Sequence, residues 1–260
     1  MTSSTLYVER PSAVHRLNPV TKLVALLCVI VVVFAIPQWW ASVAVLLVVI
    51  VPTAAISGCG AALARIGGQI LLPLLVVLVL VQGLTFPGGQ TVLWEWGPLA
   101  LTTEGLMFAA TIGARIVVLV LSSVLLVLTT HPGDLMSALT ESGMSPKVAY
   151  IVSSTLQLIP SFRARADSIL LAQQARGLAV PRNPVRRLGV LMPLLGPLVL
   201  GMFTDVEERS TAMEARGFGS TAKRTTLTPV RDSAAQKVAR WVMPAVALLA
   251  VVLQVCWVLL

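Results

Sequence analysis

The chain has 260 residues, of which 57% are hydrophobic and 12% are charged, and its mean hydropathy is +0.89. A soluble domain carries about 25% charged residues, so this composition excludes an ordinary soluble protein and predicts an integral membrane protein. The formal net charge of +8 would suit nucleic acid, but basic cytoplasmic loops explain it more simply. No basic patch alternates with aromatic residues, so we expect no nucleic-acid partner.

The cysteines and histidines do not form a recognisable site. Cys28, Cys59 and Cys256 are scattered and make no Cys-x-x-Cys motif, so no disulfide framework is predicted. His15 and His131 lie far apart and have no cluster of further ligand residues around them. A protein metal site usually needs three or four nitrogen, sulfur or oxygen ligands, and we therefore expect no metal site in this chain.

Apolar runs predict about five transmembrane helices, because a spanning helix needs roughly 20 apolar residues. The first run begins near residue 20 and has no clear small-residue cleavage site at its end, so we expect a retained span and not a signal peptide. Trp39 and Trp40 follow it and suit the membrane interface. The predicted spans are residues 20–36, 41–56, 70–86, 105–128 and 241–260.

Charge in the loops predicts the orientation. Arg10, Arg16 and Lys22 precede the first span, Arg65 lies in the predicted second loop, and residues 87–104 carry Glu95 and Glu104 with no Lys or Arg. Residues 131–240 hold 14 Lys and Arg against eight Asp and Glu. Since cytoplasmic loops are rich in Lys and Arg, the N-terminus and this long basic segment should be cytoplasmic and the C-terminus outside. The expected domains are residues 1–130, 131–240 and 241–260.

Two long helices are predicted in the basic segment. The first covers residues 146–176, with Ser145 as its N-cap and Pro146 at its first position, and Pro160 should kink it. The second covers about residues 184–216. Within it, residues 188–203 are apolar enough to suggest a further span. This run is short and contains Pro193 and Pro197, so we favour a helix at or outside the bilayer surface.

Both long helices end in the same triplet, Ala175-Arg176-Gly177 and Ala215-Arg216-Gly217. Helix chemistry alone can explain one copy, because Gly is the preferred residue after a helix and Arg complements the helix dipole. Two identical copies, 40 residues apart, favour a second interpretation. An exposed Arg at a helix tip presents a planar fork that suits a carboxylate in a partner's groove. We therefore expect both helix ends to bind partners, each through its Arg.

Arg115 is the clear candidate for a charge inside the membrane. An ionisable residue within a span is often functional, which would suit a self-contained secondary transporter. We favour snorkelling, or an ion pair with Glu104 or Glu95, because one Arg without an intramembrane acid makes a poor ion relay and no clear inverted repeat is present. An ordinary ABC importer permease is a further alternative, although two Arg-tipped helices in one chain fit it less well.

These residues resemble the transmembrane T-component, EcfT or CbiQ-like, of energy-coupling factor (ECF) transporters. The two triplets carry the resemblance, supported by Asn-Pro-Val-Thr-Lys at 18–22 and Leu-Gln-Leu-Ile-Pro at 156–160. Family members often have Asp-Pro-Arg-Thr-Lys at the first place and Arg-Phe before the Ile-Pro, and this chain departs at both. Residues 18–22 could equally be a helix cap followed by a snorkelling Lys.

The resemblance implies an all-α membrane protein of a prokaryotic cell membrane with long cytoplasmic coupling helices. It implies that Arg176 and Arg216 dock in two ABC-type ATPase subunits, and that the coupling helices carry a membrane-embedded S-component that binds a vitamin or a transition-metal ion. The partners would bind ATP, because this chain has no GxxxxGK[ST] phosphate loop and is expected to be a non-catalytic subunit without a cofactor of its own. Pro160, Pro193 and Pro197 are the candidate hinges.

Overall fold

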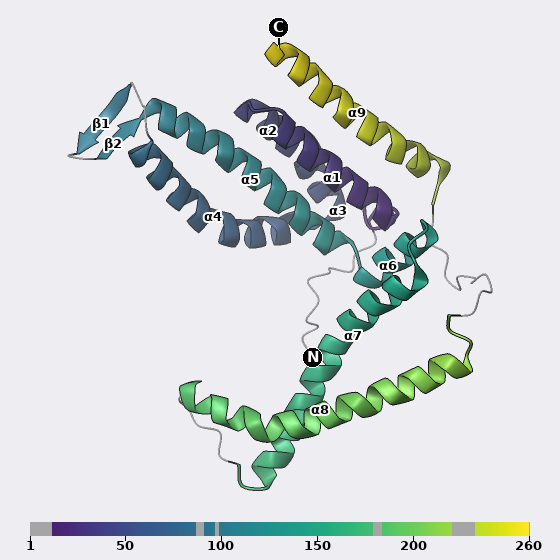
Figure 1. The fold of residues 1–260 in the computed structure, drawn as a ribbon. Coiled ribbons are helices and arrows are strands. Elements are labelled where there is room, and N and C mark those ends of the chain that lie inside the picture. Colours follow the sequence, from purple (N-terminus) through teal and green to yellow (C-terminus); the bar gives the residue numbers. More distant parts are fainter. Residues whose placement is uncertain (1–11, 87–90, 97–98, 179–183, 220–231, 260) are drawn as a thin grey trace. The chain divides into compact units, whose positions relative to one another are not determined.

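The computed structural model describes residues 12–86, 91–96, 99–178, 184–219 and 232–259 (Figure 1). The chain divides into two compact units. Residues 5–138 and 230–260 form one, called here the membrane unit, and residues 139–229 form most of the other, called here the two-helix unit. The boundary falls within the short helix α6 (Pro132–Glu141).

The membrane unit is built from apolar helices that coincide with the five predicted spans. Four stretches are long and apolar enough to cross a bilayer, while α1 is shorter at 17 residues. The second stretch, Trp39–Ser57, is a continuous run that contains one π-helical turn (η1, Leu46–Ile50) between α2 and α3. The helices are α1 (Pro19–Ala35), α2 (Trp39–Val45), α3 (Val51–Ser57), α4 (Gly60–Thr85), α5 (Thr103–Thr129) and α9 (Ala234–Leu259). The chain is thus a multi-pass, mainly α-helical membrane protein.

Three details differ from the expectation. The third span begins at Gly60 and not at residue 70, so Arg65 lies on an exposed face of α4 and not in a loop. The cause is Gly58, whose φ of 67° ends α3 and leaves a turn so short that α4 starts two residues later. The last helix also begins earlier than expected. An unexpected antiparallel hairpin, β1 (Val92–Trp96) and β2 (Leu99–Thr102), precedes α5.

Small residues let α4 and α5 pack closely. A Cβ added at Gly67 would lie 2.5 Å from Leu121 Cδ2, and one at Gly113 would lie 3.0 Å from Leu75 Cδ2. Close approach over small residues is the usual basis of helix association in membranes. The buried core is shared by α1, η1, α3, α4 and α5 and contains Val33, Ile50, Ala54, Cys59, Leu63, Val118 and Leu128.

The start of α1 ties three helices of the membrane unit together. The Asn18 side chain caps α1 by accepting a hydrogen bond from Val20 N at 2.9 Å, and its backbone N–H donates to Gln236 Oε1 of α9. The Lys22 Nζ donates to the Thr129 carbonyl at 2.7 Å, where α5 ends. The predicted cap is confirmed, but Lys22 does not simply snorkel, because it satisfies a helix-terminal carbonyl of a neighbouring helix.

Replacing Lys22 with Met should therefore destabilise the membrane unit. A hydrogen bond from a charged donor contributes about 1.5–3 kcal/mol, and the Lys22→Met change should lower the free energy of unfolding in mixed micelles by that amount. Lys237→Met is the matched control, since Lys237 is exposed on α9, and it should change stability by less than about 0.5 kcal/mol. Equal effects of the two substitutions would show that the Lys22–Thr129 contact does not stabilise the fold.

The two-helix unit contains α7 (Pro146–Ala175) and α8 (Pro184–Ala215), which have the bounds predicted from the sequence to within one residue. Each continues through its prolines: Pro160 lies inside α7, and Pro193 and Pro197 lie inside α8. Residues 188–203 belong to α8, which is not among the helices apolar enough to span a membrane in the described part of the chain.

The two long helices bury very little. Ala149 is the one buried side chain among the described residues of α7 and α8. Large apolar side chains remain open on both, with Ile151 62% exposed, Met192 76% exposed and Phe203 64% exposed. The apolar faces of α7 and α8 are therefore largely exposed within the described part of the two-helix unit.

Candidate functional site

The first triplet forms a regular helix end. Ala175 is the last residue of α7, Arg176 is its C-cap, and Gly177 follows with φ of 93°. The Gly177 N–H donates to the Gln174 carbonyl at 2.9 Å, and the Leu178 N–H donates to the Gln173 carbonyl at 3.0 Å. These two bonds define the Schellman motif, in which a residue with positive φ closes the helix.

The second triplet repeats this geometry at the end of α8. Gly217 has φ of 68°, its N–H donates to the Glu214 carbonyl at 2.9 Å, and the Phe218 N–H donates to the Met213 carbonyl at 2.9 Å. The sequence repeat is therefore also a structural repeat. The helix-end interpretation is confirmed for the Gly residues, since L-residues rarely adopt this backbone conformation.

Helix capping does not account for the arginine side chains. Arg176 and Arg216 are both exposed, and neither guanidinium hydrogen-bonds to another group in the part of the chain that the structure describes. A Cβ added at Gly177 or Gly217 would meet nothing within 4 Å, so the helix tips are also open at their sides. Each Arg therefore presents its five N–H donors to the surroundings and can accept a carboxylate or carbonyl partner.

Substituting Gly217 by Ala should loosen this helix end without touching Arg216. The left-handed conformation costs an L-residue about 1–2 kcal/mol, so the protecting bond at Phe218 N–H should open about 5–30 times more often. Amide hydrogen exchange at Phe218 measures this directly. Gly189→Ala in the same helix is the control, because Gly189 has ordinary helical φ and open space, and it should leave the exchange unchanged. Unchanged exchange in Gly217→Ala would contradict the assignment.

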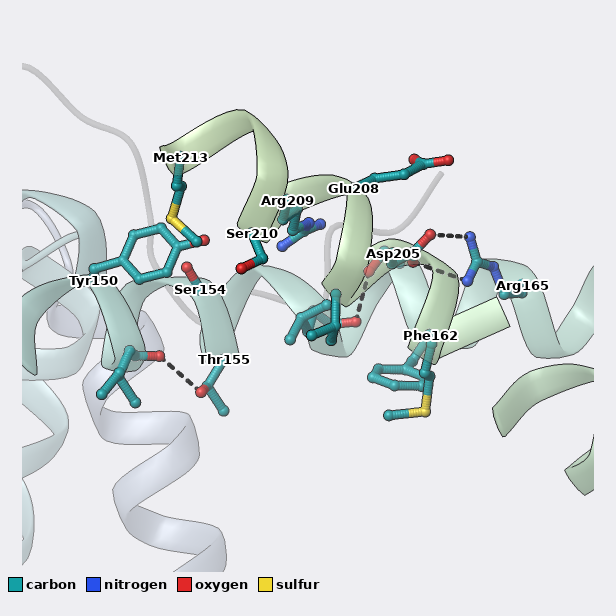
Figure 2. A pocket seen from close by; sticks show the side chains of 15 residues that line it. Tyr150, Ser154, Thr155, Phe162, Arg165, Asp205, Glu208, Arg209, Ser210 and Met213 are labelled. Atoms are coloured by element: carbon teal, nitrogen blue, oxygen red, sulfur yellow. Dashed lines mark hydrogen bonds and ion pairs between the residues drawn. The ribbon is translucent and has the colours of Figure 1, made fainter. Parts of the chain in front are cut away.

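The two helices cross at one charged contact (Figure 2). Arg165 on α7 donates from Nη1 to Asp205 Oδ2 at 2.8 Å and from Nη2 to Asp205 Oδ1 at 3.0 Å. The guanidinium lies over Gly201, where an added Cβ would come within 2.9 Å of Arg165 Nη1. Gly201 and Asp205 are one helical turn apart and therefore lie on the same face of α8. Gly201 leaves space for the Arg165 side chain, and Asp205 accepts its hydrogen bonds.

An open groove of about 690 Å³ runs beside this contact between α7 and α8. Tyr150 and Met213 face one another at its far end (Figure 2), and the rings of Tyr150 and Phe218 are 5.1 Å apart between centroids. The C-terminal part of α8 therefore lies beside the N-terminal part of α7. Arg176 and Arg216 consequently project on opposite sides of the crossing.

Electrostatics keep the crossing contact charged at neutral pH. The hydrogen bonds from Arg165 lower the pKa of Asp205 below its usual value, and they raise the pKa of Arg165. A carboxylate with a lowered pKa stabilises the folded state above the pKa of the unfolded chain, about 3.9, and this contribution is lost as the pH falls through the lowered value. Both partners of the ion pair are thus charged at every physiological pH.

Arg115 contacts the end of a neighbouring helix. Its Nη2 donates to the carbonyl of Ile36 at 3.4 Å, at the C-terminal end of α1. The expected pairing with Glu104 is wrong within the described residues, because Glu104 instead accepts hydrogen bonds from Thr91 and Thr103. The Glu95 side chain lies outside the described residues. Arg115 therefore complements the dipole of α1 and satisfies one of its last carbonyls.

The remaining predicted residues have simple placements. Pro160, Pro193 and Pro197 are exposed within their helices, and each removes one backbone hydrogen bond from its helix. Their use as hinges stays a prediction. In the described ranges no group of three or more His, Cys, Asp or Glu residues is arranged to hold a metal ion.

The sequence reading missed Arg165, Gly201 and Asp205. A signal was present, because residues 165 and 205 are separated by the same 40 residues as Arg176 and Arg216. Each crossing residue therefore precedes its docking Arg by 11 residues, or about three helical turns. Aligning the two helices by the 40-residue repeat places Arg165 and Asp205 at equivalent positions, and an Arg and an Asp can form an ion pair.

Comparison with known proteins supports one family. The CbiQ family model, described as a cobalt transport protein, matches residues 11–227. The chain is 34% identical over 229 residues to an energy-coupling factor transporter transmembrane protein EcfT of Lacticaseibacillus paracasei, covering 84% of this chain and 86% of the relative. It is 33% identical over 239 residues to the EcfT of Thermanaerovibrio acidaminovorans, covering 86% of each.

A third EcfT, from Limosilactobacillus fermentum, is 32% identical over 231 residues and covers 84% of this chain and 85% of the relative. The matched region contains α1 to α8 and both Ala-Arg-Gly triplets. This chain therefore belongs to the CbiQ/EcfT family, the transmembrane components of energy-coupling factor transporters.

Proposed function

We propose that this chain transmits ATP-driven motion from two ABC-type ATPase subunits to a membrane-embedded S-component that binds the substrate. The proposal rests on the two exposed arginines, Arg176 and Arg216. Each lies at a helix end closed by a Schellman motif, and the two ends are on opposite sides of the crossing. Two equivalent tips suit two equivalent docking grooves. Arg176 docks in one ATPase subunit and Arg216 in the other.

The residue type fits such a groove. A guanidinium can bind a carboxylate through two parallel hydrogen bonds, and its planar fork fixes the orientation of the partner as well as the affinity. The chain itself has no GxxxxGK[ST] loop, so ATP binds to the partners and this subunit catalyses no reaction.

The charge distribution supports a cytoplasmic position for the two-helix unit, where ATP is available. Residues 131–240 hold 14 Lys and Arg against eight Asp and Glu, and the loops on the other side of the spans carry none or only acidic residues. With five spans, the N-terminus is cytoplasmic and the C-terminus is outside. The protein lies in the cell membrane of a prokaryote.

The uncovered apolar faces of α7 and α8 suit the S-component. Ile151, Met192 and Phe203 are each more than 60% exposed, and an apolar membrane protein lying over them would remove that surface from water. The cargo is a vitamin or a transition-metal ion. The description of the matched family as a cobalt transport protein supports the metal ion.

Transmission follows from the geometry of the crossed pair. ATP binding closes two ATPase subunits upon each other, and their grooves carry the tips of α7 and α8 with them. The angle between the two helices then changes, and the surface under the S-component changes with it. Pro160, Pro193 and Pro197 lie where the helices lack backbone hydrogen bonds and can absorb the bend.

Charge reversal at the two tips tests the docking role. Losing a buried interfacial charge pair costs about 2–5 kcal/mol, so Arg176→Glu or Arg216→Glu should weaken ATPase binding by about 30-fold or more. The measurement is co-purification of the ATPase subunits with the tagged chain from its native membrane, quantified by mass spectrometry.

Arg163→Glu is the matched control, because Arg163 is an exposed Arg on the same helix at a distance from the tip. It should retain the ATPase subunits. Full recovery of both ATPase subunits with Arg176→Glu and with Arg216→Glu would refute the proposal. Recovery of one subunit from each single variant would show that the two tips dock independently.

A further inference from the structure

We propose that Arg165, Asp205 and Gly201 fix the point at which α7 and α8 cross, and that the two helices rotate about this point. The three residues are thus positioning residues for the docking arginines Arg176 and Arg216. This inference rests on the proposed function, since it specifies how one motion reaches two tips.

The contact has the properties of a fixed point. The fork of Arg165 holds both oxygens of Asp205, at 2.8 and 3.0 Å, which fixes direction as well as distance. Gly201 leaves room for the guanidinium beside α8, and a Cβ added there would lie 2.9 Å from Arg165 Nη1, so the guanidinium would have to shift. The side chains are only 39% and 34% exposed, so the pair is partly shielded from water.

The surroundings of the contact permit rotation. A packed helix interface resists changes of angle, because interlocked side chains have few alternative arrangements. Here an open groove of about 690 Å³ lies beside the contact, and Ala149 is the one buried side chain among the described residues of the two helices. One firm polar contact with little packing around it holds a position while leaving the angle free.

The contact also lies at the same distance along each helix from the two docking arginines. Arg165 precedes Arg176 by 11 residues, and Asp205 precedes Arg216 by 11 residues. Each arm from the crossing to its docking Arg is therefore about 16 Å long. Rotation about this point moves the two tips by equal amounts, which suits two ATPase subunits that move symmetrically.

An exposed ion pair without any such role is the alternative. Surface ion pairs often contribute little to stability, so a loss of stability alone would not separate the two explanations. The separating property is the motion itself. A fixed crossing point keeps residues beside it at a constant distance while residues along the arms move.

Spin-label distances in the assembled complex measure this motion. One label pair replaces Ala164 and Thr204, which are exposed beside the crossing, and a second replaces Leu171 and Thr211, which are exposed along the two arms. The three native cysteines are first changed to alanine. Distances are recorded in lipid nanodiscs with the co-purified ATPase subunits, without nucleotide and with a non-hydrolysable ATP analogue.

We expect the pair at the crossing to give one narrow distance that the ATP analogue leaves unchanged, while the pair on the arms shifts. Arg165→Gln should broaden the distance at the crossing and abolish the shift on the arms. The exchange of charges, Arg165→Asp with Asp205→Arg, should restore both. Arg163→Gln is the matched control, because Arg163 is exposed on α7 two residues before Arg165 and forms no salt bridge among the described residues.

Two results would overturn the inference alone: equal shifts of both label pairs, or an unchanged pattern in Arg165→Gln, each with the ATPase subunits still bound. Absence of the ATPase subunits from the wild-type complex would overturn the proposed function and this inference together. Rescue by the exchanged charges identifies the pair itself, since a variant that is merely unstable would not recover its motion through a second substitution.

Discussion

The bidentate contact between Arg165 and Asp205 holds the two long helices of the two-helix unit together where they cross. It joins two helices of 30 and 32 residues that otherwise bury almost nothing between them. Because the helices run in opposed directions through the crossing, their C-terminal ends project on opposite sides. The repeated Schellman ends then fix the backbone at Arg176 and Arg216, so that the unit presents two equivalent basic tips.

The two units of the chain follow different physical rules. In the membrane unit, Gly67 and Gly113 let α4 and α5 approach closely, and Asn18 and Lys22 form hydrogen bonds with the ends of α1 and α5. In the two-helix unit, long apolar faces remain open. This contrast fits the proposed coupling role, in which the two-helix unit is covered by partner proteins.

Local chemistry made much of this predictable. Pro146 and the two Ala-Arg-Gly triplets mark helix bounds by sequence alone, and they were confirmed to within one residue. The start of α4 was missed because Arg65 and the small residues before it look like a loop, although Gly58 ends the preceding helix early. The partners of Arg115 and Arg165 were missed because both lie on other helices, 79 and 40 residues away, and only tertiary structure brings them together. The open tips could be proposed from their repetition, whereas the crossing between them could not.

Photo-cross-linking at the two helix tips measures whether Arg176 and Arg216 lie against ATPase subunits. Benzoylphenylalanine would replace Gln174 or Glu214, which are exposed two residues before Arg176 and Arg216, and the tagged complex would be irradiated in native membranes. We expect each position to become attached to an ABC-type ATPase chain, as identified from the cross-linked peptides by mass spectrometry. Attachment of both positions only to this chain itself, or to proteins that are not ATPases, would contradict this expectation.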